Sequence, residues 1–181
     1  MITSGISLVN FKLKKDTKKI KENLTFIIKN KNQVIYSLSK NYLNSYKYKK
    51  IKNYKKSKNF RIIGMGGSTL GAQAIYAFLK DKIKKKFKFI DNLQNFKKKN
   101  NNENYTNLII SKSGNTIETI VNANILIKNK DKNIFVTENK KNYLSLLAEK
   151  LKAEIIHHNN FIGGRYSVLS EVGMLPAELM D

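Results

Sequence analysis

Short apolar runs alternate with amphipathic stretches from about residue 60 onward. Five runs consist almost entirely of apolar residues and end at polar or glycine-containing turns: 60–65, 87–90, 106–111, 133–137 and 153–157. Runs of this kind are typical of strands that are buried on both faces. Because helical patterns separate them, the sequence predicts βαβ units and one parallel sheet. Right-handed crossovers then give an α/β fold, a three-layer αβα arrangement around a doubly wound parallel sheet.

The stretches between these runs carry apolar residues at helical spacing. After the first run, the spacing is set by Leu70, Ala74, Ala77 and Phe78. Further helices are predicted over 117–127, 142–152 and 167–173. Residues 93–104 are rich in Asn and Lys and are predicted to form a short helix or loop.

The first 55 residues follow another pattern. A helix is predicted to begin at Asp16 or Thr17, with an apolar face formed by Ile20, Leu24, Ile27 and Ile28. The apolar residues of 34–43 suggest a second helix, and 47–59 read as a polar connector dotted with tyrosines. We therefore expect a helical N-terminal extension over residues 1–55 and one domain over residues 56–181.

Composition narrows the class of protein. The chain has 181 residues, enough for one domain with a sizeable core, and no Cys that could form disulfides or a thiolate metal site. No apolar run reaches the length that crosses a membrane, and the N-terminus lacks the order of a secretory signal. We expect a soluble cytoplasmic protein that does not associate with membranes.

The charge is strongly positive. The chain holds 35 Lys+Arg against 13 Asp+Glu, a formal net charge of +22, and only Arg61 and Arg165 are arginine. A nucleic-acid surface more often uses Arg, whose planar fork grips phosphates and guanine edges. The joint excess of Lys, Asn and Ile instead indicates an AT-rich coding bias. We expect salt-sensitive contact with polyanions and no specific nucleic-acid partner, although a nucleic-acid binder stays an alternative.

A glycine-rich turn follows the first predicted strand. It reads Gly64-Met65-Gly66-Gly67-Ser68 and opens a helix. The first N–H groups of a helix point out of its end, where the macrodipole leaves partial positive charge. Gly67 lets the backbone approach an anion, and Ser68 adds a hydroxyl donor, so the turn suits a phosphate. The alternative is an ordinary β–α turn with Ser68 as N-cap.

A second turn of this kind follows the strand over 106–111. It carries Ser111, Lys112, Ser113 and Thr116 before a helix. Neutral donors and a helix end can hold a phosphate dianion without a metal. The carboxyl ends of parallel strands share one edge of the sheet, so both turns can converge on one phosphorylated ligand. We interpret Lys112 as a loop lysine and Glu118 as a first-turn carboxylate that stabilises its helix.

A third segment brings two glycines and an arginine together. Gly163-Gly164-Arg165 is followed by a predicted helix. Arg165 is suited to stabilise negative charge on an oxygen during a reaction, and the alternative is an ion pair with a carboxylate at a helix start. His157 and His158 are adjacent on a predicted strand. They point to opposite faces and cannot easily share a ligand.

The three segments together carry a family resemblance. GMGGSTLG at 64–71, SKSGNTIET at 111–119 and GGRYSVLSEVGMLP at 163–176 resemble the glucose-6-phosphate isomerase family, in its order and at its spacing. The resemblance implies a sugar isomerase (SIS) domain with a flavodoxin-like fold. It also implies metal-free and nucleotide-free interconversion of glucose 6-phosphate and fructose 6-phosphate through an enediol(ate), in glycolysis and gluconeogenesis. The complete enzyme is expected to be a homodimer.

The resemblance assigns roles to particular residues. Arg165 matches the arginine that stabilises the enediol(ate). Residues matching the sugar-phosphate pocket are Gly67, Ser68, Ser111, Lys112 (mainly through its backbone), Ser113 and Thr116.

The resemblance also implies missing parts. The family's second SIS domain, general-base glutamate and ring-opening histidine lie after the segment that ends at Asp181, and neither Glu118, Glu171 nor His157 sits in a matching motif. We therefore expect a fragment that binds sugar phosphate weakly and turns it over hardly at all. The alternative is a lone SIS module that senses a sugar phosphate.

Overall fold

The computed structural model of the chain describes residues 17–30, 32–93, 103–128 and 130–181. Within them, five strands form one sheet in the order β2-β1-β3-β4-β5, and every neighbouring pair is parallel. The strands are β1 (Asn59–Gly64), β2 (Lys86–Ile90), β3 (Thr106–Ile110), β4 (Lys132–Glu138) and β5 (Glu154–His158). The predicted parallel sheet is confirmed, and each strand lies within about one residue of the predicted run.

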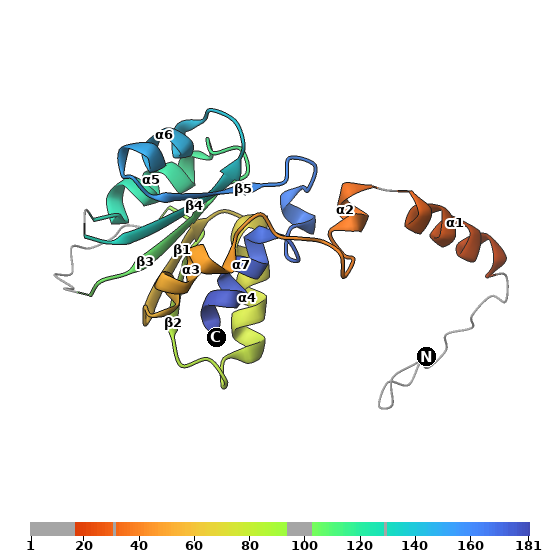
Figure 1. Cartoon of the computed structure of the whole chain (residues 1–181), viewed down its shortest axis with the longest axis horizontal. Helices are drawn as coiled ribbons and strands as arrows, with labels where there is room; N and C mark the ends of the chain where they lie inside the picture. Colours follow the sequence, from red (N-terminus) through yellow and green to blue (C-terminus); the bar gives the residue numbers. More distant parts are fainter. Residues whose placement is uncertain (1–16, 31, 94–102, 129) are drawn as a thin grey trace.

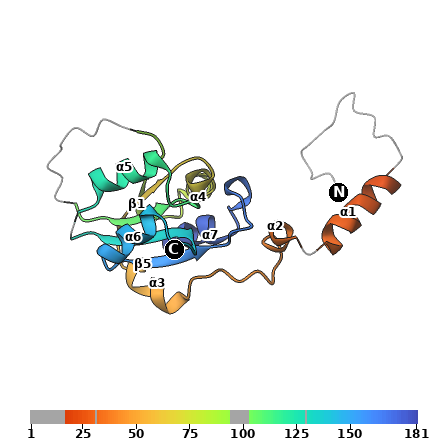
Figure 2. The ribbon, with the colours of Figure 1, turned by 90° about the horizontal axis from the view of Figure 1, so that it is seen from above.

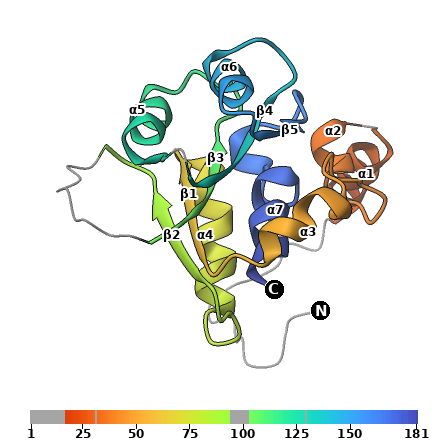
Figure 3. The ribbon, with the colours of Figure 1, turned by 60° about the vertical axis from the view of Figure 1, so that its left-hand side comes forward.

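Helices cover both faces of the sheet (Figures 1 and 3). Their bounds are α1 (Lys18–Lys29), α2 (Gln33–Tyr36), α3 (Tyr48–Lys55), α4 (Gly67–Leu79), α5 (Ile117–Leu126), α6 (Tyr143–Lys150), a 3-10 turn (Gly164–Tyr166) and α7 (Glu171–Met180). Helices α3, α4 and α7 pack on one face, while α5 and α6 pack on the other. The domain therefore has the predicted three-layer αβα arrangement.

The core consists of two apolar layers, one on each face of the sheet. On one face Phe60 and Phe87 stack with ring centroids 4.7 Å apart, beneath α4 and α7. On the other face Phe135, with no exposed surface, packs under α5 and α6. Alternate residues of each strand serve the two layers, which is why the strands read as continuous apolar runs.

The order of the strands reverses between β1 and β3. The chain leaves β1 through α4 on one face to reach the edge strand β2, and it leaves β3 through α5 on the opposite face to reach β4. The edge of the sheet beyond the carboxyl ends of β1 and β3 is thus the topological switch point, the place where ligands bind in open α/β sheets.

The buried face of α4 differs from the pattern that predicted the helix. Leu70 and Phe78 are exposed, Phe78 to 88%, and Ala74 and Ala77 are also exposed. The helix instead buries Thr69 and Ala72, with Tyr76 packed against the aromatic pair of β1 and β2. The face of α4 that packs on the sheet is therefore more polar than the face defined by the four apolar residues used in the prediction.

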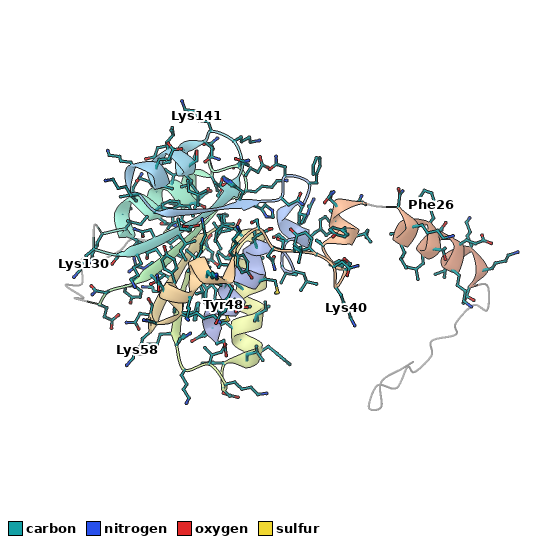
Figure 4. The ribbon with its side chains drawn as sticks, in the orientation of Figure 1. Phe26, Lys40, Tyr48, Lys58, Lys130 and Lys141 are labelled. Carbon is teal, nitrogen blue, oxygen red and sulfur yellow. The ribbon has the colours of Figure 1, made fainter. Side chains whose placement is uncertain are left out.

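The N-terminal extension, called the lead-in below, differs from the predicted helices in the part that the structure describes. Helix α1 forms, but none of its residues is buried, and it lies away from the sheet (Figures 1 and 2). Figure 4 shows Phe26 of α1 with its side chain directed away from the domain. The second predicted helix shrinks to the four residues of α2, and the predicted connector contains α3, whose Ile51 is fully buried in the core.

The last predicted helix begins later than expected. Residues 167–170 are turns, and α7 runs from Glu171 through Pro176 to Met180. Most of the predicted helix or loop over 93–104 lies outside the described residues.

Candidate functional site

The two glycine and hydroxyl turns leave adjacent strands at the switch point. The last residue of β1, Gly64, is paired in register with Ile110, the last residue of β3. The corner is tight, because a Cβ added at Gly64 would lie 2.8 Å from the Ile110 carbonyl oxygen and 3.0 Å from Cβ of Ser68. Ser68 and Ser113 therefore stand at neighbouring corners of the same sheet edge.

The first turn begins α4 without a side-chain cap. Gly66 is the N-cap residue at φ +54°, a conformation that favours glycine, and Ser68 already lies inside the first turn of the helix. The alternative interpretation of Ser68 as the N-cap is therefore wrong. The Ser68 side chain is half-buried beside the corner.

The second turn presents hydroxyls at two depths. The hydroxyls of Ser111 and Thr116 are hydrogen-bonded at 2.9 Å, and Ser111 is only 3% exposed. Ser113 is exposed, and its Oγ accepts from the backbone N–H of Asn115 at 3.3 Å. A hydroxyl has both donor and acceptor capacity, so an anion can still receive a hydrogen bond from Ser113.

Helix α5 begins at this turn with open donors. Its N-cap Thr116 makes no side-chain cap, and the first intrahelical bond is donated by Ile120. Among the described residues, no acceptor takes the N–H groups of Ile117, Glu118 or Thr119. Uncapped N–H groups and the positive end of the helix dipole at the switch point are features suited to an anion.

The second turn is fixed from the side of α6. Gly114, at φ +68°, packs so closely on Asn142 that an added Cβ would collide with its side chain. The amide of Asn142 donates to Oγ1 of Thr137, which in turn donates to the Lys112 carbonyl at 3.2 Å. The turn is thus held by buried hydrogen bonds.

The ammonium group of Lys112 contacts the Asn160 carbonyl and the carboxylate of Glu138. Its Nζ donates to the Asn160 carbonyl at 2.6 Å and lies 3.6 Å from Oε1 of Glu138. A hydrogen bond from Lys140 and the charges of Lys140 and Lys112 hold the pKa of the Glu138 carboxyl below its usual range, against the effect of burial. Lys112 therefore links the second turn to the segment that precedes Arg165.

The Arg165 segment lies directly against the first turn. A Cβ added at Gly67 would collide with the backbone of Gly164. The hydroxyl of Ser167 donates to the Gly164 carbonyl at 2.7 Å and lies 3.5 Å from that of Gly67. All three sequence motifs therefore meet at the carboxyl edge of the sheet.

Arg165 is exposed in the 3-10 turn. Its guanidinium makes no hydrogen bond or ion pair with any residue that the structure describes, so the alternative of a carboxylate partner finds no support there. Arg61, the other arginine, lies in β1, where its guanidinium donates to Asn107 and to the Leu126 carbonyl and stacks 4.1 Å from the Tyr105 ring centre.

Sequence reasoning missed a buried contact between His158 and Glu171 beside this segment. Nδ1 of His158 lies 3.3 Å from Oε2 of Glu171, and both side chains are almost fully buried. Burial alone would raise the pKa of the Glu171 carboxyl, but hydrogen bonds from His158, its own backbone, Ser45 and Tyr42 together lower it. The predicted opposition of His157 and His158 is confirmed, since His157 is exposed. The separation of His158 and Glu171 along the sequence gives no indication that their side chains are in contact.

The fold and the placement of these turns define a three-layer α/β domain of the sugar isomerase type. A hypothetical protein from Thermus thermophilus superposes with a TM-score of 0.62 at 23% identity, over 73% of this chain and 36% of that one. Tagatose-6-phosphate ketose/aldose isomerase from Escherichia coli gives a TM-score of 0.51 at 16% identity, over 66% of this chain and 36% of that one. At such identities the likeness concerns the fold alone.

The family follows from sequence comparison. The family model described as Phosphoglucose isomerase matches residues 14–180, and the chain belongs to this family. Glucose-6-phosphate isomerase from Methanocaldococcus jannaschii is 38% identical over 143 residues, covering 72% of this chain and 34% of the relative. The enzyme of that name from Borreliella afzelii is 34% identical over 174 residues, covering 86% and 32%.

The chain spans about a third of the length of these curated relatives. Within the described residues, no helix combines the length and apolar character needed to cross a membrane.

Proposed function

We propose that this chain supplies the sugar-phosphate site and the intermediate-stabilising arginine of a glucose-6-phosphate isomerase. The observation that carries the proposal is the close approach of Gly164 to Gly67, which places the Arg165 segment beside two donor-rich turns at the switch point. A sugar phosphate needs one subsite for its phosphate and a neighbouring subsite for the negative charge that develops at its other end. In this proposal the two turns form the first subsite and Arg165 forms the second.

The phosphate subsite is formed by the start of α5. Its free N–H groups and the exposed hydroxyl of Ser113 donate to the phosphate oxygens, while Ser68 donates from the neighbouring corner. The pair of hydroxyls from Ser111 and Thr116 supports the turn from below. Because these donors are neutral, binding depends on geometry and the helix dipole.

Arg165 acts on the reacting end of the sugar. Isomerisation moves a proton between C1 and C2 through an enediol(ate), whose oxygen carries negative charge. A guanidinium without an internal partner is available to stabilise that charge as it develops. Removing a positioned acid or base costs on the order of 10²–10⁴-fold in rate. No residue of this chain is assigned to either role, so we expect binding with very slow turnover.

Calorimetric titration of the 181-residue chain with glucose 6-phosphate tests the proposal. Wild type is expected to bind, and Ser113→Ala is expected to weaken binding by about fivefold to tenfold, because one hydrogen bond to a charged group is lost. Ser39→Ala is the matched control, since Ser39 is exposed in a turn of the lead-in. Equal affinity of the Ser113 and Ser39 variants, or binding of unphosphorylated glucose as tight as that of its phosphate, would contradict the phosphate subsite.

A further inference from the structure

The segment that carries Arg165 is closed at its base by one buried contact. His158 is the last residue of β5 and Glu171 is the first residue of α7, so their contact brackets residues 159–170. The side chains are 1% and 2% exposed. A buried hydrogen-bonded contact of this kind holds its two backbones together, since separating the partners would leave polar groups buried and unpaired.

The histidine also holds the interior of the segment. Nε2 of His158 lies 3.0 Å from the carbonyl oxygen of Ile162, whose side chain is fully buried. Ile162 directly precedes Gly163 and Gly164. A carbonyl oxygen can only accept, so the contact with Ile162 makes Nε2 of His158 the donor.

Glu171 extends the contact to the lead-in. Its Oε1 accepts from the Tyr42 hydroxyl at 3.0 Å and from the Ser45 backbone N–H at 3.1 Å. Burial, the charge of Glu171 and the hydrogen bond to it raise the pKa of the Tyr42 hydroxyl. These two donors hold Oε1, and the carboxylate is thereby oriented with Oε2 toward His158.

We propose that His158 is a positioning residue for Arg165, acting by holding the Ile162 carbonyl while Glu171 fixes the orientation of the imidazole. The proposal rests on the role of Arg165 proposed above. The anchored carbonyl sets the path of the two glycines, and this path seats Gly164 on Gly67 with Arg165 next in the chain. The tie from Lys112 to the Asn160 carbonyl restrains the same stretch from the second turn.

Two amide substitutions separate the contacts of the imidazole. In His158→Gln the side-chain amide nitrogen reaches the position of Nε2, so the donor to Ile162 is kept and the donor to Glu171 is lost. In His158→Asn the amide nitrogen corresponds to Nδ1, so the donor to Glu171 is kept and the donor to Ile162 is lost. His157→Asn, on the exposed neighbour, is the control.

The first readout requires no ligand. In amide NMR spectra of the full chain, His158→Asn is expected to shift Gly163, Gly164 and Arg165 strongly, while His158→Gln leaves them close to wild type. Equal shifts in the two variants would overturn the positioning role. The dispersion of the same spectra shows whether each variant is folded, so a folding failure is distinguished from a loss of positioning.

The second readout separates positioning from binding. A five-carbon aldonate phosphate carries a carboxylate where the enediolate would form, so its affinity reports on Arg165, whereas glucose 6-phosphate affinity reports mainly on the phosphate turns. His158→Asn is expected to weaken the aldonate phosphate at least about tenfold and glucose 6-phosphate less than about twofold. Parallel loss of both ligands would overturn the proposal. If wild type binds neither ligand, the proposed function fails, and the ligand-free spectra still decide whether His158 holds the segment.

Discussion

Gly67 is the residue at which two of the three motifs touch. A Cβ at this position would collide with the Gly164 backbone, and backbone cannot move aside as a side chain can. Gly67→Ala is therefore expected to lower the free energy of unfolding by about 1–3 kcal/mol and to weaken sugar-phosphate binding. Urea denaturation and calorimetric titration measure the two effects.

Gly163→Ala provides the control for that substitution. The atom that an added Cβ would meet is Cδ2 of Tyr166 at 3.8 Å, an ordinary contact, and the residue has an unstrained φ of −71°. We expect no loss of stability, or a gain of up to about 1 kcal/mol. Should both alanine variants behave alike, the close approach at Gly67 would not be a constraint of the folded chain.

Glu171 predicts an acid limit to stability. Its pKa is lowered on folding, so the unfolded chain takes up this proton more readily than the folded one. The contribution of Glu171 is complete above the unfolded-state value of about 4.3 and is lost as the pH falls through the lower folded-state pKa. Urea unfolding across the acid range should therefore show a slope that Glu171→Gln reduces. The exposed Glu149→Gln should leave the slope unchanged, and a slope insensitive to both changes would contradict the assignment.

For single residues, the sequence predicts which side chains can donate hydrogen bonds better than it predicts which residues they contact. Ser113 and Arg165 are exposed, as a ligand-binding role requires. The pairing of Ser111 with Thr116, the link from Lys112 to Asn160 and the His158–Glu171 contact bring together residues whose neighbours are set by the fold. No local pattern of residue types encodes those distances.

The N-terminus of α6 is the element that supports the second turn. Asn142 caps the helix by accepting from the Ser145 N–H at 2.9 Å, and its amide nitrogen donates to Thr137 and to the Lys140 carbonyl. Asn142→Ala is expected to cost about 1–2 kcal/mol of unfolding free energy and to weaken phosphate binding. Asn142→Asp keeps the capping acceptor and removes the donors.

The pair of variants separates the cap from the support of the turn. The aspartate variant is expected to retain more stability than alanine while losing phosphate affinity to a similar degree, as measured by denaturation and titration. Wild-type affinity in Asn142→Asp would show that the second turn does not need the hydrogen bonds from α6.

At the element scale the strands could be predicted, because short apolar runs bounded by turn residues are typical of strands that are buried on both faces. Helix faces were less predictable. The burial of Thr69 in place of Leu70 depends on how α4 lies on the sheet, and the start of α7 depends on the Arg165 segment packing ahead of it. Helix α3 was missed because it is rich in lysine and buries one residue, Ile51, with Tyr54 packed against the core beside it.

At the scale of the whole molecule, the sheet domain carries the stability and α1 adds none. No residue of α1 is buried, and its apolar side chains are exposed. Replacing Ile20 and Leu24 of α1 by alanine is therefore expected to change the unfolding free energy of the domain by less than about 0.5 kcal/mol in a urea titration. Ile51→Ala, which empties a core position, should cost about 2–5 kcal/mol in the same assay. A double substitution in α1 as costly as the core substitution would show that α1 packs on the domain in solution.

The lysine excess is also a property of the whole molecule. Lysines such as Lys40, Lys58, Lys130 and Lys141 lie at the periphery in Figure 4. Their exposure agrees with the interpretation of the charge as solvated surface. The three motifs, by contrast, gather at one edge of the sheet, as the proposed ligand site requires.

The most direct test of the account is a map of amide NMR shifts in the 181-residue chain on addition of glucose 6-phosphate. The account predicts the largest changes at residues 67–69 and 113–119, which are the corners after β1 and β3, with smaller changes around Arg165. Changes confined to other residues, such as Tyr42, His157 and Phe161 that line a separate hollow, would contradict it.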